Sequence, residues 1–453
     1  MSGPNDSGQP GFSNQRRYRA EGQGWDEAAP RRAAVVHPEL RSRDGASARD
    51  PARRLEEAVG LAGAINLDVL HQEAVTLSKP APATLLGGGV VERLHDVVAA
   101  QTLDLVIIDH TLTPVQQRNL ERALEAKVID RTGLILEIFG ARARTHEGRL
   151  QVELAALTYQ RSRLVRSWTH LERQRGGLGF IGGPGESQLE IDRRLIDERI
   201  AKLKRELEQV RRTRGLHRKA REKVPYPVVA LVGYTNAGKS TLFNRLTGSD
   251  VFAKDLLFAT LDPTMRRVEL PSGREVILSD TVGFITDLPT DLVAAFRATL
   301  EEVTGADVIV HVRDAAAAES AFEKQDVEAV LESLNIDPDV PVVEALNKID
   351  ALDADERAAA ASEAARLDRA ACLSALTGEG VDRLLSVVDE ALSRRRAIKR
   401  YDVSLADGRA LSWLYEHAQV VERDDEGAVA HLAVAIDPED AARFERRYRR
   451  AAE

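Results

Sequence analysis

The chain has 453 residues, 43% hydrophobic and 30% charged, so it is long enough for about three domains and has enough apolar residues to form packed cores. It lacks the eighteen or so consecutive apolar residues of a membrane span, and its first residues lack the apolar centre of a secretory signal. The single Cys372 excludes an internal disulfide and a cysteine-built zinc site, and the net charge of −9 argues against a protein that coats nucleic acid. These features predict a soluble protein of the cytoplasm.

Residues 1–52 are rich in Gly, Ser, Pro, Arg and Asp and show no apolar periodicity. This composition predicts a disordered tail, because it offers too little apolar surface to order the backbone. An arm that contacts RNA is the alternative interpretation.

Residues 53–149 alternate helical patterns with short apolar runs, which predicts a small α/β domain. The runs at 103–109 and 127–130 are typical of buried parallel strands, and residues 113–124 between them have a helical pattern. Before a further helical segment at 90–100 stands the triplet Gly87-Gly88-Gly89. The triplet is either a phosphate-binding turn or an ordinary turn between strand and helix.

Residues 150–224 carry two heptad stripes, which predict an antiparallel helical hairpin. The first stripe is formed by Leu150, Leu157, Leu164 and Leu171, and the second by Leu189, Ile196, Leu203 and Val210. The loop 176–185 has six glycines in ten positions, more than a turn requires, and is either a tip shaped for a partner or a plain connector. From Arg193 to Lys223 thirteen Lys/Arg face five Asp/Glu, so we expect the second helix to contact RNA.

Residues 225–398 again alternate strands and helices, and they contain a phosphate-binding signature. The buried strand 228–232 leads into a G-x-x-x-x-G-K-S loop and then a helix, the context in which backbone N–H groups surround phosphates. We expect Lys239 to contact the β- and γ-phosphates, as a catalytic residue, and Ser240 to bind magnesium. The predicted nucleotide-binding residues of this loop are Gly233, Tyr234, Thr235, Asn236, Ala237, Gly238, Lys239 and Ser240.

Two further segments fit the γ-phosphate side of the same site. The apolar run 276–279 ends in Asp280, Thr281, Val282 and Gly283, where the carboxylate suits an outer-shell hold on magnesium and the Gly283 N–H can sense the γ-phosphate. A loop between the two motifs contains Phe258, Ala259, Thr260, Leu261 and Asp262 and continues to Thr264. Thr260 or Thr264 can bind magnesium when the γ-phosphate is present and move away after hydrolysis.

The pattern of the next strand ends predicts recognition of guanine. Strand 342–346 leads into Asn347-Lys348-Ile349-Asp350, and the Asp350 carboxylate can accept hydrogen bonds from N1–H and the amino group of guanine. After strand 371–373, a backbone N–H of Ser374, Ala375 or Leu376 can reach the guanine O6. Four motifs in this order at strand ends identify a GTP-binding domain.

Two positions bear on the mechanism. Phe284 follows Gly283 where many GTPases have a water-orienting glutamine, so we expect slow intrinsic hydrolysis that needs a partner or another polar group. The Asn236 carbonyl either helps to hold potassium between the phosphates or only shapes the loop.

The last segment, residues 399–453, predicts a small α+β domain with strands near Val403, Val420 and Val434, a helix at 411–417 and a charged final helix. The predicted fold class is therefore α/β. A P-loop GTPase domain with a doubly wound, mostly parallel sheet follows a small α/β domain and a helical hairpin, and precedes a small α+β domain.

These residues resemble the HflX family, in the Obg–HflX group of translational GTPases. The resemblance runs from about 55 to 398 and rests on the phosphate loop, on residues 258–264, on 183–190 with Asp192-Arg193-Arg194, and on 113–120 with Asp130-Arg131. It favours Thr260 over Thr264 as magnesium ligand, and Phe284 agrees with the family's hydrophobic residue at that position. The lysine that some members have in the first domain's glycine turn is replaced here, so an ATP-binding role is not carried over.

The resemblance implies a cytoplasmic GTPase that binds the large ribosomal subunit and its rRNA, is stimulated by that contact, and splits stalled or stressed ribosomes. It implies that the first domain and the hairpin reach toward the peptidyl-transferase region. We expect a monomer with no DNA partner and no integral membrane association. Two alternatives stay open: a ribosome-assembly GTPase or RNA chaperone, and a nucleotide-regulated ribosome silencer.

Overall fold

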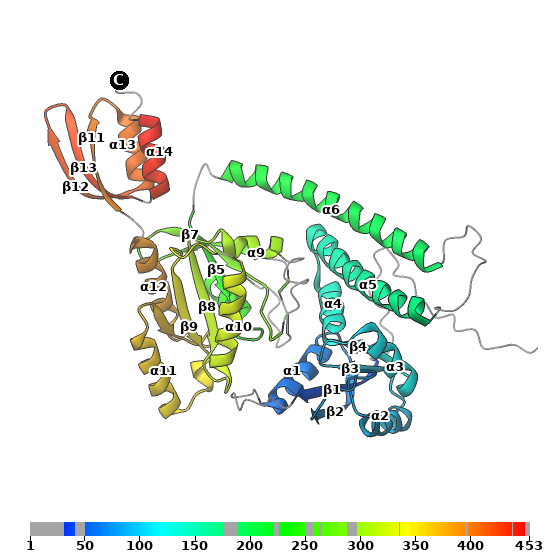
Figure 1. Ribbon diagram of the computed structural model, residues 1–453. Coiled ribbons are helices and arrows are strands. Elements are labelled where there is room, and N and C mark those ends of the chain that lie inside the picture. Colours follow the sequence, from blue (N-terminus) through cyan, green and yellow to red (C-terminus); the bar gives the residue numbers. More distant parts are fainter. Residues whose placement is uncertain are drawn as a thin grey trace, which may run out of the picture.

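The computed structural model describes residues 31–40, 50–174, 188–221, 226–249, 257–258, 260–261, 264–287, 297–334, 336–394, 397–436 and 438–448. Four parts follow one another along the chain: a first α/β domain, a helical hairpin, a GTPase-type domain and a C-terminal domain (Figure 1). Within the described ranges, no helix combines the length and the apolar character needed to cross a membrane.

The first domain is a four-stranded parallel sheet of order β2-β1-β3-β4 with helices on both faces. Alternate side chains of each strand face opposite layers, so Ala33 and Val35 pack with α1 and α4, whereas Ala34 and Val36 pack with α2 and α3. The elements are β1 (Arg32–Leu40), α1 (Pro51–Gly63), β2 (Asp68–Leu77), α2 (Gly88–Gln101), β3 (Leu105–Ile108), α3 (Pro114–Leu124), β4 (Lys127–Asp130) and α4 (Arg131–Arg142).

The predicted βαβ unit is confirmed, and its helix α3 starts with a capping box. Thr113 accepts the Gln116 N–H at 3.2 Å, and the Gln116 side chain accepts the Thr113 N–H at 2.9 Å. The expected tail is wrong for residues 32–40, because this segment is β1, with β2 on one side and β3 on the other. Four consecutive apolar residues of this strand, at positions 33–36, are fully buried. Their burial stabilises the strand, although the composition of the flanking residues is typical of disorder. Residues 1–30 and 41–49 of the expected tail lie outside the described part of the chain.

The hairpin consists of α5 (His146–Gln174) and α6 (Gln188–Arg221). The predicted heptad contact is confirmed where the side chains are described: Leu150, Leu203 and Leu207 form a buried cluster between the helices. Arg199 of α6 adds a bidentate pair with Glu153 of α5, at 2.7 and 2.9 Å. The glycine-rich loop 176–185 lies outside the described residues.

The GTPase-type domain is a six-stranded sheet of order β10-β9-β8-β5-β7-β6, parallel except for β6. Residues of α9 and α10 cover one face, and residues of α7 and α12 cover the other, which is the expected doubly wound arrangement. The elements are β5 (Val228–Val232), α7 (Lys239–Thr247), β6 (Thr264–Glu269), β7 (Glu275–Asp280), α9 (Arg297–Thr304), β8 (Val308–Asp314), α10 (Ser320–Ser333), β9 (Val342–Asn347), η1 (Ile349–Ala351), α11 (Ala354–Arg366), β10 (Ala370–Cys372) and α12 (Val381–Arg394).

The C-terminal domain is an antiparallel sheet of order β11-β13-β12 with its own apolar core. Phe444 of α14 and Leu414 of α13 are buried in this core. The elements are β11 (Ala397–Ser404), α13 (Gly408–His417), β12 (Gln419–Glu426), β13 (Val429–Ile436) and α14 (Pro438–Tyr448). The predicted strands and helices of this domain are confirmed.

Candidate nucleotide-binding site

The phosphate loop joins the carboxyl end of β5 to α7, and two glycines determine its path. Gly233 has φ of +150°, and a Cβ there would lie 2.2 Å from the Val312 carbonyl oxygen. Gly238 has φ of +94°, and a Cβ there would lie 2.2 Å from Nδ2 of Asn347. Only glycine fits both positions, so the loop closes tightly over the start of α7, where helix N–H groups favour an anion.

Lys239, the first residue of α7, is buried beneath this loop. Its Nζ donates to the carbonyl oxygens of Gly233 at 3.0 Å and Tyr234 at 2.7 Å. Burial lowers the pKa of Lys239 to about 8, although the charges of Asp280 and Glu323 oppose the shift. Among the residues that the structure describes, no carboxylate forms an ion pair with this ammonium, an arrangement that suits a phosphate.

Three oxygen groups from three segments meet beside Lys239. The Ser240 hydroxyl donates to Oδ2 of Asp280 at 2.8 Å, the Thr260 hydroxyl donates to the same oxygen at 2.8 Å, and the two hydroxyls are 2.8 Å apart. Burial raises the pKa of Asp280, whereas the hydrogen bond from Ser240 and the Lys239 charge lower it. Hard oxygen ligands of this kind are those that Mg²⁺ prefers, so the residues present fit the ion.

Gly283 lies against the phosphate loop. A Cβ at Gly283 would be 2.9 Å from Cγ2 of Thr235 and 3.1 Å from Nζ of Lys239. Two backbone hydrogen bonds connect the next residue to the loop, from Thr235 N to Phe284 O at 2.7 Å and from Phe284 N to Gly233 O at 3.1 Å. The Phe284 side chain is fully buried in the core, so it presents no group to a phosphate.

Asn347, the first residue of the Asn-Lys-x-Asp motif, connects the phosphate loop to the loop that follows β10. Its Nδ2 donates to the Ala237 carbonyl of the phosphate loop at 2.8 Å, and its Oδ1 accepts the Ala375 N–H at 2.9 Å. Lys348 pairs with Asp314 at 2.8 Å, and Asp350 is exposed on η1. Asn347 therefore links the phosphate loop to the segment formed by Ser374, Ala375 and Leu376. Asp350, three residues after Asn347, is exposed to solvent.

Several predicted site residues have side chains that contact other parts of the protein interior. The Tyr234 side chain bonds with Glu57 and Thr286, and the Thr281 hydroxyl donates to the Leu231 carbonyl at 2.6 Å. The side chains of Phe258, Leu261 and Val282 are buried in an apolar cluster. These residues can contact a nucleotide only through their backbone. Ala259 and Asp262 lie outside the described residues.

Residues absent from the sequence prediction also shape the site. Arg245 of α7 donates to the carbonyls of Ala375, at 2.6 Å, and Leu376, so it holds the loop that the sequence predicts to contact guanine. No signal in a single sequence marks this arginine. Arg131 of the first domain contacts Thr286, in the segment after Gly283, and Glu57 contacts Tyr234 of the phosphate loop. Of the two first-domain residues, only Arg131 entered the sequence analysis, as part of the family resemblance.

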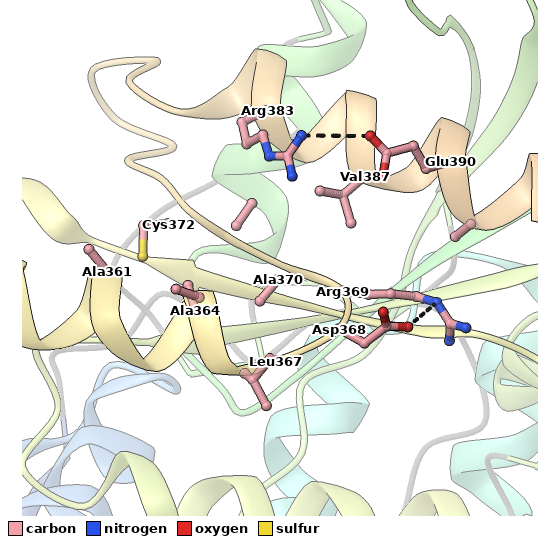
Figure 2. A pocket seen from close by; sticks show the side chains of 13 residues that line it. Ala361, Ala364, Leu367, Asp368, Arg369, Ala370, Cys372, Arg383, Val387 and Glu390 are labelled. Atoms are coloured by element: carbon pink, nitrogen blue, oxygen red, sulfur yellow. Dashed lines mark ion pairs between the residues drawn. The ribbon is translucent and has the colours of Figure 1, made fainter.

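A separate cleft of about 430 Å³ lies between α11 and α12 beside the edge strand β10 (Figure 2). Alanines line it, and Arg383–Glu390 and Arg369–Asp368 pairs flank it at 3.7 and 3.5 Å. None of the predicted nucleotide-binding residues lines this cleft.

Four family models match the chain in order. They are described as GTP-binding GTPase N-terminal, at residues 52–140; GTP-binding GTPase Middle Region, at 142–221; 50S ribosome-binding GTPase, at 228–348; and HflX C-terminal domain, at 359–452. Among solved structures, a GTP-binding protein from Sulfolobus solfataricus in complex with GDP is 24% identical, covers 80% of this chain and 99% of its own, and has a TM-score of 0.42.

Curated relatives match most of the chain. The GTPase HflX of Magnetococcus marinus is 53% identical over 388 residues, which are 85% of this chain and 88% of that protein. The GTPase HflX of Escherichia coli K12 is 45% identical over 379 residues, 83% of this chain and 88% of that protein. With such identity over most of both chains, and with the phosphate, γ-phosphate and guanine motifs assembled at one sheet edge, the chain belongs to the HflX family of GTPases.

Proposed function

We propose that the chain binds GTP with Mg²⁺ at the carboxyl edge of the GTPase sheet and that ribosome contact triggers hydrolysis. The observation that carries the nucleotide assignment is the cluster of Ser240, Thr260 and Asp280 oxygens beside buried Lys239. In this proposal Ser240 and Thr260 hold the metal, Asp280 orients them, and Asp350 reads guanine. The bound ion would neutralise charge that develops on the phosphates.

Hydrolysis requires a water in line with the γ-phosphate, and the residues that the structure describes supply only part of that arrangement. Lys239 and the loop amides hold the phosphates, and the Gly283 N–H marks where the γ-phosphate sits. Because Phe284 is buried and apolar, the residue after Gly283 cannot orient the water. Intrinsic turnover is therefore slow and depends on a group that the ribosome supplies or rearranges.

A potassium ion is a further candidate for charge near the phosphates. Asn236 is exposed on the loop with φ of +60°, so its side chain is available to a bound cation rather than held in the core. Equal turnover rates in sodium and potassium would contradict this part of the proposal.

The partner proposed is the large ribosomal subunit with its rRNA, in the cytoplasm, with a monomeric chain splitting stalled ribosomes. Support comes from the family description of residues 228–348 as a 50S ribosome-binding GTPase. Exposed basic side chains along α6 offer contacts for rRNA phosphates, although some pair with acidic neighbours four residues away. Those on described positions include Arg193, Arg194, Lys202, Lys204, Arg205 and Arg212.

The experiment is a GTPase assay with and without large subunits, in potassium and in sodium, with subunit dissociation followed by light scattering. We expect stimulation by the large subunit and loss of intact ribosomes in GTP. Stimulation by free rRNA or immature particles alone would favour an assembly role. Chain that stays bound while ribosomes remain intact after GTP is consumed would favour a silencer.

A companion variant tests the hairpin tip. Residues 176–185 are replaced by an equal-length Gly-Ser linker, with an Arg205→Ala variant on α6 as a second probe of the hairpin. We expect the linker variant to lose most of the ribosome stimulation and to keep basal hydrolysis. Equal losses of both rates would show that the loop has no specific role at the ribosome.

A further inference from the structure

The first domain contacts both loops that surround the γ-phosphate side of the site. Phe258, two residues before Thr260, packs edge-on against Phe139 of α4, with ring centroids 4.7 Å apart. Both rings belong to one apolar cluster that also contains Leu61 of α1 and Phe284. The loop that carries Thr260 is therefore seated on the first domain while Thr260 contacts Ser240 and Asp280.

A polar contact through Tyr234 joins the first domain to the second of these loops, which contains Gly283 and Thr286. The Tyr234 hydroxyl of the phosphate loop donates to Glu57 of α1, accepts the Thr286 N–H at 2.9 Å and lies 2.7 Å from the Thr286 hydroxyl. Thr286 stands three residues after Gly283. Glu57 thus fixes, through one tyrosine, the backbone that positions Gly283.

Arg131, the first residue of α4, contacts the same Glu57 and Thr286. Its guanidinium donates to Glu57, to the Thr286 carbonyl at 2.9 Å and to Oδ1 of Asp109 at 2.6 Å. Arg131 is only 4% exposed, and the carboxylates of Asp109 and Glu57 raise its pKa against the effect of burial. Asp109 is itself held by His37 at 2.8 Å. A buried charge network of this kind has a defined geometry, because each charge needs its partners.

From these contacts we infer that Glu57 and Arg131 are positioning residues of the GTPase, which hold the segment of Gly283 in the arrangement that favours a bound triphosphate. The loop of Thr260 is held in the same arrangement through the contact of Phe258 with Phe139. The inference rests on the nucleotide site proposed above. In this structure Thr260 contacts Ser240 and Asp280, and both loops contact the first domain. By linkage, docking of the first domain and GTP binding then favour each other, whereas GDP, which lacks the γ-phosphate, gains less.

The test compares three full-length variants. Tyr234→Phe removes the bridging hydroxyl and keeps the ring in the core, and Glu57→Gln keeps the shape and removes the charge. Tyr159→Phe is the matched control, because its hydroxyl also donates to a buried carboxylate, Asp130 at 2.5 Å, but away from the nucleotide site. Affinities for GDP and a non-hydrolysable GTP analogue are measured with fluorescent nucleotides, and amide exchange of peptide 280–287 is measured without nucleotide.

We expect Tyr234→Phe and Glu57→Gln each to reduce the preference for the GTP analogue over GDP by about tenfold, the usual effect of losing a hydrogen bond to a charged group. Peptide 280–287 should exchange faster in both variants, and the double variant should lose no more than either single one. Tyr159→Phe should match the wild type. An unchanged preference in both variants, or equal loss of GDP and analogue, would overturn the inference. Failure of the wild type to bind either nucleotide would instead overturn the proposed site.

Discussion

Gly283 has no room for a side chain, because a methyl group there would meet Thr235 and Lys239 within about 3 Å. We predict that Gly283→Ala lowers GTP turnover by at least tenfold and leaves GDP affinity within about threefold, since the clash lies on the γ-phosphate side. Gly140→Ala is the control, because a Cβ on this helical glycine of α4 meets nothing within 4 Å. Stopped-flow nucleotide binding and phosphate release measure both quantities, and wild-type turnover would refute the role given to Gly283.

Asp350 is the residue on which nucleotide selectivity depends in this proposal. Its exposed carboxylate accepts hydrogen bonds that guanine donates, and an amide would also donate to the O2 of xanthine. We predict that Asp350→Asn weakens GTP binding by about tenfold or more and improves XTP binding, with competition assays as the measurement. Asp355→Asn, in the first turn of the following helix, should leave selectivity unchanged. Unaltered guanine preference would remove Asp350 from the site.

Glu344 provides a pH-dependent contribution to stability. It accepts ion pairs from Lys324 at 2.9 Å and Arg313 at 3.2 Å and lies 3.7 Å from His311. Burial would raise its pKa, but the partners, His311 first, lower it to about 2 from the usual 4.5. Because the folded pKa is the lower one, the stabilisation of about 3 kcal/mol is present above pH 4.5 and is lost as the pH falls toward 2.

We therefore predict that Glu344→Gln destabilises the chain most at neutral pH and progressively less below pH 5. Urea unfolding at pH 7 and pH 4 measures the difference between the two proteins. Glu363→Gln is the control, because Glu363 contacts the same arginine from a half-exposed position. If the difference in unfolding free energy between the wild type and Glu344→Gln grew on acidification, this result would contradict the lowered pKa of Glu344.

At the scale of elements, the helices and strands that the sequence predicted are those whose residue pattern lies within one short segment of the chain. The heptads of the hairpin, the helical pattern at 113–124 and the strand–loop–helix order around Lys239 each lie within one short segment of the chain. Strand β1 could not be predicted in this way, because its stability comes from β2 and β3, which lie later in the sequence. In the candidate site, the segments that follow the strands of the GTPase-type domain lie together as the sequence predicted. The contacts of Glu57 with Tyr234 and of Arg131 with Thr286 were missed, because these partners lie far apart in sequence.

The position of β1 gives a test at this scale. A chain that starts at residue 31 keeps the strand, and a chain that starts at residue 41 loses it from the interior of the sheet. We predict native-like thermal unfolding for the longer chain, and for the shorter one loss of first-domain helix in circular dichroism with exposed apolar surface that binds ANS. Equal stability of the two chains would mean that β1 contributes little to the domain.

At the scale of the whole molecule, the first domain and the GTPase domain share one apolar cluster, whereas the C-terminal domain has its own. We predict that a fragment of residues 226–453 unfolds at lower temperature than the full chain and binds ANS, because Phe258 loses the ring it packs against. Addition of the separate first domain and hairpin, residues 31–221, should reverse the dye binding. A fragment as stable as the full chain would show that the shared cluster is energetically minor.

The shared cluster also affects the order of events during biosynthesis. Phe139 leaves the exit tunnel about 120 residues before Phe258, and at 5–20 residues per second this delay is on the order of ten seconds. For that time the nascent first domain exposes an apolar face that its later neighbour has not yet covered. Chaperones acting early in synthesis are the expected protectors of this face, and slowing translation between the two rings would lengthen its exposure.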